Sequence, residues 1–332
     1  MTPGVPLIDT FGRVHNKLRI SVTDRCNIRC YYCMPETGAA FAARAGLLSV
    51  EEIERIARVA VRLGLRKIRL TGGEPLVWKD LAILIERLLR IDGLEDLGLT
   101  TNGVLLADRA CELYNAGLRR INIHLDTMDR DAYRRITRRD VFDRVIRGLR
   151  VANELGFRPV KINAVAVKDQ SEQDVVDLAR FGRESGMQVR FIEFMPLDAQ
   201  GLWNLHKVLP ADEIVAILGR AIGPLIPVPA SDERAPAAEF RFADGTGTVG
   251  FISSVTKPFC GNCNRLRLTA DGQLRYCLFA VEETDLRPML RSTDDDDIAG
   301  AIVRCVRAKW QGHSIQSVKF VPPPRPMSAI GG

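Results

Sequence analysis

Short apolar runs alternate with helical patterns of apolar residues from Leu18 to about residue 195. Apolar runs of this length, set between helical patterns, are typical of strands. We therefore predict strands at Leu18–Thr23, Lys67–Leu70, Asp96–Thr100, Arg119–Asp126, Val160–Val167 and Gln188–Met195.

The segments between these runs predict helices. Ser49 and Glu52 form a capping-box pattern, and apolar residues follow at helical spacing up to Ala60. Six β/α units in series predict parallel strands joined by helices, in a partial (β/α)6 barrel of the TIM type. Chemistry on such folds lies at the carboxyl ends of the strands. Further helices are predicted at Leu81–Arg90, Asp108–Ala116, Val141–Leu155 and Glu172–Glu184.

The β/α pattern stops after Met195 and Pro196, which predicts one domain over 1–196 and a C-terminal α+β domain over 197–332. In the second domain, Asp244 and Gly245 mark the turn of a hairpin with strands at 239–243 and 248–253. The last helix is predicted from about Asp295 to Trp310. The tail after residue 322 is rich in Pro and Gly, and by local rules we expect it to be disordered.

Composition is ordinary for a globular protein of 332 residues, with 46% hydrophobic and 27% charged residues. No apolar run approaches the roughly 20 residues of a membrane span, and residues 1–17 lack a signal-peptide core. The net charge of +6 suits nucleic acid or a phosphorylated small molecule, but the chain has no basic block of the kind that marks a nucleic-acid-binding tail. Eight cysteines, six of them in two groups, favour metal binding in the cytoplasm over disulfides.

The first group, Cys26, Cys30 and Cys33, lies on a loop directly after the first strand. Three thiolates without a fourth indicate a metal centre with an open position, and an iron–sulfur cluster with one uncapped iron meets that description. Half of a zinc site, or three reduced core cysteines, is the alternative.

The second group combines Cys260 and Cys263 with Cys277, and Asp271–Gly272 marks a turn that brings Cys277 back to the pair. Again there are three thiolates. A zinc site completed by His313 or His206 is the alternative reading of this group.

Basic residues occur within or beside several apolar strands and the second cysteine group. Buried cations are costly unless they are paired, so those that face the barrel interior indicate an anionic ligand such as a triphosphate. Strand alternation turns about half of such a set toward solvent. The residues are Arg19, Lys67, Arg69, Lys161, Arg190, Arg265 and Arg267.

The first cysteine spacing, with Tyr32 before its last cysteine, resembles the signature of the radical S-adenosylmethionine (SAM) superfamily. With the second group, the chain more closely resembles the GTP 3′,8-cyclase family of that superfamily, along almost its whole length. The further matching segments are Thr71–Pro75, Thr100–Gly103, Asn264–Arg267 and the terminal Gly331–Gly332.

The resemblance implies two 4Fe–4S clusters, one on each cysteine group, and binding of SAM and GTP. His124 stands where many relatives carry a serine that contacts SAM, so the geometry of that contact is expected to differ. The SAM contacts implied are Tyr32, Gly73, His124 and Met195. The GTP contacts expected are Arg19, Lys67, Arg69, Thr100, Lys161, Arg190, Arg265, Leu266 and Arg267. Arg19 is expected near the reacting ribose, and Gly331 and Gly332 inside the catalytic cavity.

The implied activity is conversion of GTP to (8S)-3′,8-cyclo-7,8-dihydroguanosine 5′-triphosphate, the first step of molybdenum cofactor biosynthesis. The implied partners are an electron donor, a downstream cyclic pyranopterin monophosphate synthase and a second copy of the chain. Two other functions stay open on the sequence: a radical SAM enzyme that modifies a peptide, and a zinc-stabilised nucleotide- or RNA-binding module without catalysis.

Overall fold

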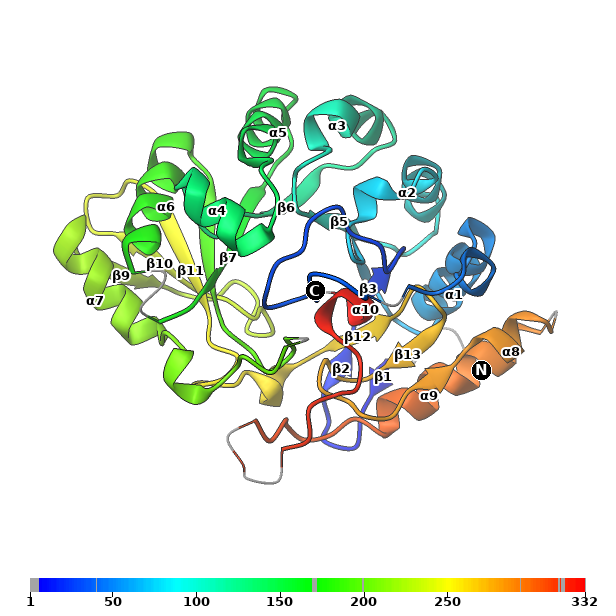
Figure 1. Cartoon of the computed structure of the whole chain (residues 1–332). Helices are drawn as coiled ribbons and strands as arrows, with labels where there is room; N and C mark the ends of the chain where they lie inside the picture. The colour runs from blue at the N-terminus through cyan, green and yellow to red at the C-terminus, as the bar shows by residue number, and fades with distance from the viewer. Residues whose placement is uncertain are drawn as a thin grey trace.

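The centre of the fold is a run of parallel strands whose connections are helical (Figure 1). The computed structural model describes residues 6–39, 41–168, 172–198, 200–292, 294–315, 317 and 320–331. All the strands predicted in the first domain are confirmed, with ends that shift by a residue or two. In pairing order they are β3 (Lys17–Ser21), β4 (Lys67–Thr71), β5 (Asp96–Thr101), β6 (Arg120–His124), β7 (Val160–Ala166) and β8 (Gln188–Glu193).

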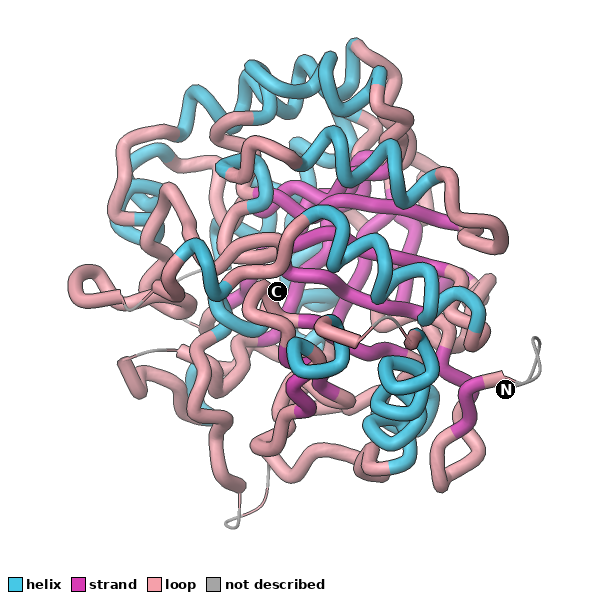
Figure 2. The backbone as a smooth tube through the Cα atoms, turned by 90° about the vertical axis from the view of Figure 1, so that its right-hand side faces the viewer, coloured by secondary structure: helices cyan, strands magenta, loops and turns pink. Residues whose placement is uncertain are grey.

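Helices cover the outer face of this sheet (Figures 1 and 2). The predicted capping box is present: the Ser49 hydroxyl accepts from the Glu52 N–H at 3.2 Å, and the Glu52 carboxylate accepts from the Ser49 N–H at 2.8 Å. The predicted helices are α1 (Val50–Arg62), α2 (Leu81–Leu89), α3 (Leu106–Asn115), α5 (Phe142–Glu154) and α6 (Glu172–Ser185). Two further helices, α4 (Arg130–Thr137) and α7 (Ala211–Ala221), were not predicted from the sequence.

Strands from the C-terminal part of the chain extend the same sheet at both edges. β12 (Arg265–Leu268) pairs in parallel with β3, and β11 (Thr248–Ile252) pairs in parallel with β8. The predicted hairpin is confirmed as β10 (Ala238–Phe242) and β11. β9 (Leu225–Val228), β13 (Gln273–Arg275) and β14 (Thr284–Asp285) complete the edges in antiparallel pairing. The division into two domains at residue 196 stays a prediction.

Within the part of the chain that the structure describes, the sheet runs from β14 to β9 and these edge strands do not pair with each other. The predicted partial, open barrel is therefore confirmed. The remaining elements are β1 (Leu7–Ile8), β2 (Val14–His15), α8 (Arg287–Leu290), α9 (Asp295–Arg307), α10 (Met327–Ile330) and short 3-10 turns at Arg44–Gly46, Pro75–Val77, Leu205–Lys207 and Cys260–Asn262.

Residues alternate between the two faces of the central strands. In β3, Leu18 and Ile20 are buried in the hydrophobic core, whereas Arg19 between them lines an interior cavity. The core therefore lies between the sheet and the outer helices, and the inner face is left for polar groups. Among the described residues, no helix is long and apolar enough to cross a membrane.

The C-terminal tail corrects the expectation of disorder from local rules. Residues 327–330 form α10, and Ser328 and Ile330 are buried. Figure 1 shows α10 inside the arc of the sheet, beside β3 and β12. Local rules failed here because the tail is ordered by contacts with distant residues and not by its own sequence pattern.

Candidate active site

A cavity on the inner face of the sheet is lined by residues from both cysteine groups. The groups lie far apart in the sequence, and the pairing of β12 with β3 brings their strands side by side. All the predicted ligands line this cavity, namely Cys26, Cys30, Cys33, Cys260, Cys263 and Cys277.

The other predicted site residues divide into two sets. Those that line the same cavity are Tyr32, Gly73, His124 and Met195 of the SAM set, and Arg19, Thr100, Arg190, Arg265 and Arg267 of the GTP set. Those outside its lining are Lys67, Arg69, Lys161, Leu266 and Gly331, although Met327 and Ser328 of the same tail do line it. The Leu266 side chain is fully buried in the core on the opposite face of β12, so only its backbone is available to a ligand in the cavity. Gly332 lies outside the described residues.

The first cysteine loop is held by backbone hydrogen bonds to α4. The Arg29 N–H donates to the Thr137 carbonyl at 2.9 Å, and the Tyr31 N–H donates to the Ile136 carbonyl at 3.1 Å. Within the loop, the Cys33 N–H donates to the Cys30 carbonyl at 3.0 Å, which forms a tight turn. The missed helix α4 therefore has a direct structural role at the site.

The Thr71–Pro75 segment packs against the backbone that leads into the cysteine loop. The Gly73 N–H donates to the Thr23 carbonyl at 2.7 Å, and a Cβ on Gly73 would lie 2.4 Å from the Arg25 carbonyl oxygen. Glycine is therefore required by this packing. Burial raises the pKa of Glu74 to about 7, although its carboxylate accepts hydrogen bonds from the Asn102 N–H and the Thr101 hydroxyl, each at 2.6 Å.

Tyr32 and His124 share one carboxylate partner. The Tyr32 hydroxyl donates to Asp126 Oδ2, and His124 Nε2 lies 3.0 Å from the same oxygen and 2.5 Å from the Tyr32 hydroxyl. Burial alone would lower the pKa of His124, but the charge of Asp126 and its hydrogen bond outweigh burial and raise it well above the usual value. Asp126, which was not predicted as a site residue, thus orients two predicted SAM contacts.

The second cysteine group is closed by the β12–β13 hairpin, whose turn at Asp271–Gly272 confirms the predicted return of Cys277. His313 lines the cavity, whereas His206 is exposed and lies outside its lining. Over the described parts of the chain, no three Cys, His, Asp or Glu side chains approach closely enough to hold one metal ion. In a 4Fe–4S cluster each thiolate binds a different iron, and the three thiols of each group match the ligands of such a cluster with one iron left open.

The two cysteine groups differ in electrostatics. Burial raises the pKa of Cys26 to about 12, so this thiol must release its proton when a metal binds. Burial would also raise the pKa of Cys263, but the charges of Arg265 and Lys309 outweigh it and lower this pKa to about 6. Within the second group the thiolate is therefore favoured at Cys263, whereas burial raises the pKa of Cys260.

The inner face also carries a row of adjacent arginines. The strand register places Arg267 of β12, Arg19 of β3 and Arg69 of β4 side by side. Burial, followed by the charges of Arg267, Arg265 and Arg69, holds the pKa of Arg19 well below its usual range. No carboxylate of the described residues lies within 4.0 Å of the Arg19 guanidinium. Such an excess of buried positive charge indicates an anionic ligand.

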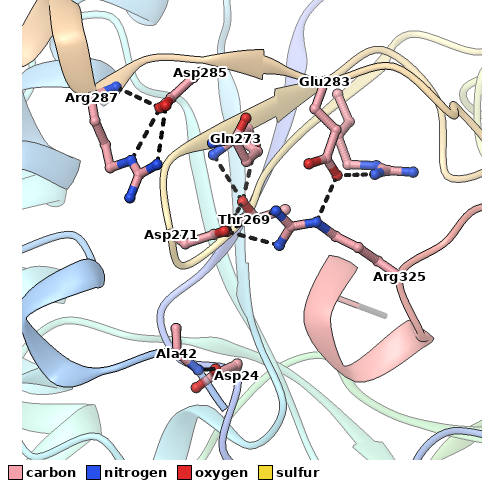
Figure 3. A network of polar contacts seen from close by, with 10 residues as sticks. Asp24, Ala42, Thr269, Asp271, Gln273, Glu283, Asp285, Arg287 and Arg325 are labelled. Atoms are coloured by element: carbon pink, nitrogen blue, oxygen red, sulfur yellow. Dashed lines mark hydrogen bonds and ion pairs between the residues drawn. The ribbon is translucent and has the colours of Figure 1, made fainter. Parts of the chain in front are cut away.

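The tail reaches this row. The Arg267 guanidinium donates to the Gly331 carbonyl, and the Ser21 hydroxyl donates to the Ile330 carbonyl at 3.2 Å. Gly331 has φ +88°, and a Cβ there would lie 2.1 Å from Ser21 Oγ. Figure 3 shows the anchor of the tail: Arg325 forms two hydrogen bonds with Asp271, at 2.9 and 3.1 Å.

Two family models match the chain. The Radical SAM superfamily model matches residues 20–182, and the Molybdenum Cofactor Synthesis C model matches residues 187–315.

Curated relatives match over the full length. A GTP 3′,8-cyclase of Rhodopirellula baltica is 52% identical, with 100% of this chain and 94% of the relative covered. GTP 3′,8-cyclase 2 of Mycobacterium tuberculosis is 48% identical, with 98% of this chain and 92% of the relative covered. A GTP 3′,8-cyclase of Thermodesulfovibrio yellowstonii is 45% identical, with 98% of this chain and 99% of the relative covered.

A solved structure with a similar fold is that of Streptococcus suis SuiB bound to S-adenosylmethionine. Its TM-score is 0.60 at 15% identity, and the match covers 91% of this chain and 69% of that one. At this identity the likeness concerns the fold alone.

Proposed function

Because this chain belongs to the GTP 3′,8-cyclase family of radical SAM enzymes, we propose that its interior cavity binds SAM, GTP and two 4Fe–4S clusters together. The enzyme converts GTP to (8S)-3′,8-cyclo-7,8-dihydroguanosine 5′-triphosphate, the first step of molybdenum cofactor biosynthesis. One observation carries the site assignment: both three-cysteine groups line the same cavity as Arg19, Arg190, Arg265 and Arg267.

Cys26, Cys30 and Cys33 would hold the first cluster. When bound, this reduced cluster and SAM supply a carbon-centred radical that is able to remove a hydrogen atom from the ribose of GTP. Tyr32, Gly73, His124 and Met195 line the adjoining part of the cavity and would contact SAM. Asp126 keeps Tyr32 and His124 in fixed orientations, which limits the positions that SAM can occupy.

The cations of the inner face would bind GTP. Arginine offers a planar set of donors that suits phosphate oxygens, and several such groups together neutralise a triphosphate. Arg19 lies beside Arg267 in the register, so it is available to the triphosphate and to the ribose. Cys260, Cys263 and Cys277 would hold the second cluster, whose open iron position would bind guanine and fix its orientation.

Gly331 would close the cavity from the side of β12. Its carbonyl accepts a hydrogen bond from the Arg267 guanidinium, and a side chain at this position would collide with Ser21. A residue without a side chain lets the tail approach the substrate and exclude water from a reactive radical.

The test is an anaerobic turnover with iron and sulfide restored, SAM, a reductant and GTP deuterated at C3′. We expect 5′-deoxyadenosine to form only when GTP is present and to carry the deuterium. Cleavage of SAM without transfer of deuterium would keep the radical SAM chemistry but reject the proposed hydrogen. Absence of cleavage with both clusters intact would refute the proposal.

Cys26→Ala is expected to abolish SAM cleavage while the second cysteine group still binds iron. Iron analysis and visible absorption measure the remaining cluster, and 5′-deoxyadenosine is quantified by chromatography. Cys111→Ala is the matched control, because Cys111 is exposed on α3 and lies outside the cavity lining. Retained cleavage in Cys26→Ala would contradict the assigned role.

Family membership decides against the two functions left open by the sequence, a peptide-modifying enzyme and a zinc-stabilised binding module. The electron donor, the downstream cyclic pyranopterin monophosphate synthase, a homodimer and the cytoplasmic location stay predictions.

A further inference from the structure

Lys309 is a buried lysine next to the second cysteine group, and it has no role in the proposed reaction. It follows the C-terminal end of α9, and only 4% of its surface is exposed. Its ammonium lies 3.5 Å from Cys263 Sγ. A buried ammonium group is costly unless hydrogen bonds and an opposite charge compensate it.

The hydrogen bonds of Lys309 are complete. Besides the contact with Cys263, its ammonium donates to the Tyr276 carbonyl at 2.6 Å and to the Arg265 carbonyl at 3.0 Å. Arg265 belongs to the strand that follows Cys263, and Tyr276 directly precedes Cys277. One side chain therefore connects the two segments that carry the cysteines.

The charge of Lys309 is not compensated in the same way. None of the carboxylates that the structure describes lies within 4.0 Å of this ammonium. Arg13 makes a useful comparison, because it also supports the second group, by donating to the Cys260 carbonyl at 2.8 Å. Arg13 is neutralised by Asp9 at 2.6 Å, whereas the Lys309 ammonium contacts the sulfur of Cys263, one of the proposed cluster ligands.

We propose that Lys309 is a positioning residue for the second cluster, with its positive charge directed at the Cys263 thiolate. It fixes the distance between the two cysteine-bearing segments and places N–H donors and charge beside a sulfur ligand. Hydrogen bonds and positive charge at ligand sulfur favour the reduced form of a cluster and slow its loss. The inference rests on the proposed two-cluster function.

The experiment uses the full-length chain with Cys26, Cys30 and Cys33 changed to Ala, so that every iron signal belongs to the second group. Three chains in this background are reconstituted: one with Lys309, one with Lys309→Met and one with Lys309→Arg. The reduction potential is measured by electron paramagnetic resonance during a redox titration, and iron loss is followed with a chelator. Lys207→Met is the control, because Lys207 also donates to a backbone carbonyl, at 3.0 Å, but lies outside the cavity lining.

We expect Lys309→Met to shift the potential to more negative values and to speed iron loss about tenfold or more. Lys309→Arg is expected to restore part of both properties, and Lys207→Met to change neither. An unchanged potential and iron loss in Lys309→Met would overturn the inference. If Lys309→Met does not fold, Lys309→Gln replaces it, and an unchanged potential there would overturn the inference equally.

A background chain that binds no cluster would refute the two-cluster proposal and this inference with it. If the background chain binds a cluster whose potential and rate of iron loss do not change on substitution of Lys309, only the inference about Lys309 is refuted.

Discussion

Glu239 shows how one side chain adjusts the positive charge of the inner face. Its carboxylate lies 3.0 Å from Arg190 and 3.6 Å from Lys161. Burial lowers the pKa of Lys161 to about 8, with a further contribution from Arg190, and Glu239 offsets this only in part. In the absence of a phosphate ligand, Glu239 therefore compensates cations that we assign to GTP.

Glu239→Gln is expected to strengthen GTP binding, because the triphosphate no longer competes with a carboxylate for these cations. A half-exposed ion pair contributes at most about 1 kcal/mol, which corresponds to a fall in Kd of about fivefold. Calorimetric titration of the anaerobic protein with GTP, GDP and guanosine measures the Kd of each ligand. The fall in Kd caused by Glu239→Gln is expected to be largest for GTP, smaller for GDP and smallest for guanosine. Asp244→Asn is the control, since Asp244 pairs with Arg183 on the surface. Equal or weaker GTP binding by Glu239→Gln would contradict the prediction.

His15 makes the stability of the chain depend on pH. It is fully buried, and its Nε2 lies 3.0 Å from Asp9 Oδ2. Burial, followed by the charge of Lys309, lowers its pKa to about 4, and Asp9 offsets this only in part. The unfolded chain therefore binds more protons below pH 6.5, and stability falls as the pH decreases from 6.5 toward 4.

Between pH 7 and pH 5 this histidine is expected to cost about 2 kcal/mol of unfolding free energy. Denaturant unfolding of the iron-free chain at both pH values measures the loss. His15→Gln is expected to be less stable at pH 7 but to lose less stability at pH 5 than the unchanged chain. The same pH dependence in both chains would show that His15 is not the group responsible.

At this scale the sequence predicted residues whose chemistry is local. Spacing alone identified the cysteines of both groups, and all of them line the cavity. Asp126, Glu239 and Lys309 could not be predicted in the same way, because their partners lie in distant segments and an isolated acid or lysine has no characteristic pattern.

Among the elements, the C-terminal tail depends most on its partners. α10 and Gly331 are placed against Ser21 and Arg267, while the tail itself is anchored by Arg325. Arg325 Nε also lies 3.0 Å from Glu283 Oε1. Figure 3 shows that this anchor joins the tail to the turn that returns Cys277 to the second group.

Arg325→Gln is expected to loosen the tail and to lower turnover about tenfold, because Gly331 then occupies its position only part of the time. Hydrogen exchange of residues 320–331 measures the tail directly, and iron content is expected to stay unchanged. Arg287→Gln is the matched control: Arg287 pairs with Asp285 in the same view but does not touch the tail. Equal exchange of the tail in both variants would argue against this anchor.

Elements with strong periodicity were predicted well, and those without it were not. The capping box of α1 and the apolar strands carry their own signals. α4 does not, because its buried positions are only Tyr133 and Thr137 among the residues of that helix. α10 consists of one turn, and its contacts are with distant residues: Met327 and Ser328 line the cavity, and the Ile330 carbonyl accepts a hydrogen bond from Ser21.

The whole molecule is built on one sheet to which both parts of the chain contribute. β12 and β11 protect the two edges of the central parallel strands, which would otherwise present unpaired backbone groups. The two cysteine groups share a cavity only because of this arrangement. We therefore expect the chain to unfold as a single cooperative unit, although the sequence pattern changes sharply at residue 196.

Three tryptophans allow this to be measured. Trp78 reports on the first part of the chain, and Trp203 and Trp310 report on the second. Urea unfolding is followed by tryptophan fluorescence in the Trp78→Phe variant and in the double variant Trp203→Phe and Trp310→Phe. Circular dichroism measures the overall stability of each variant. In each variant the fluorescence midpoint is expected to coincide with the circular dichroism midpoint. A fragment of residues 1–196 is expected to aggregate, because β3 and β8 then become exposed edges. Separate midpoints for the two reporters, or a soluble and cooperatively folded fragment, would instead identify two independent domains joined at residue 196.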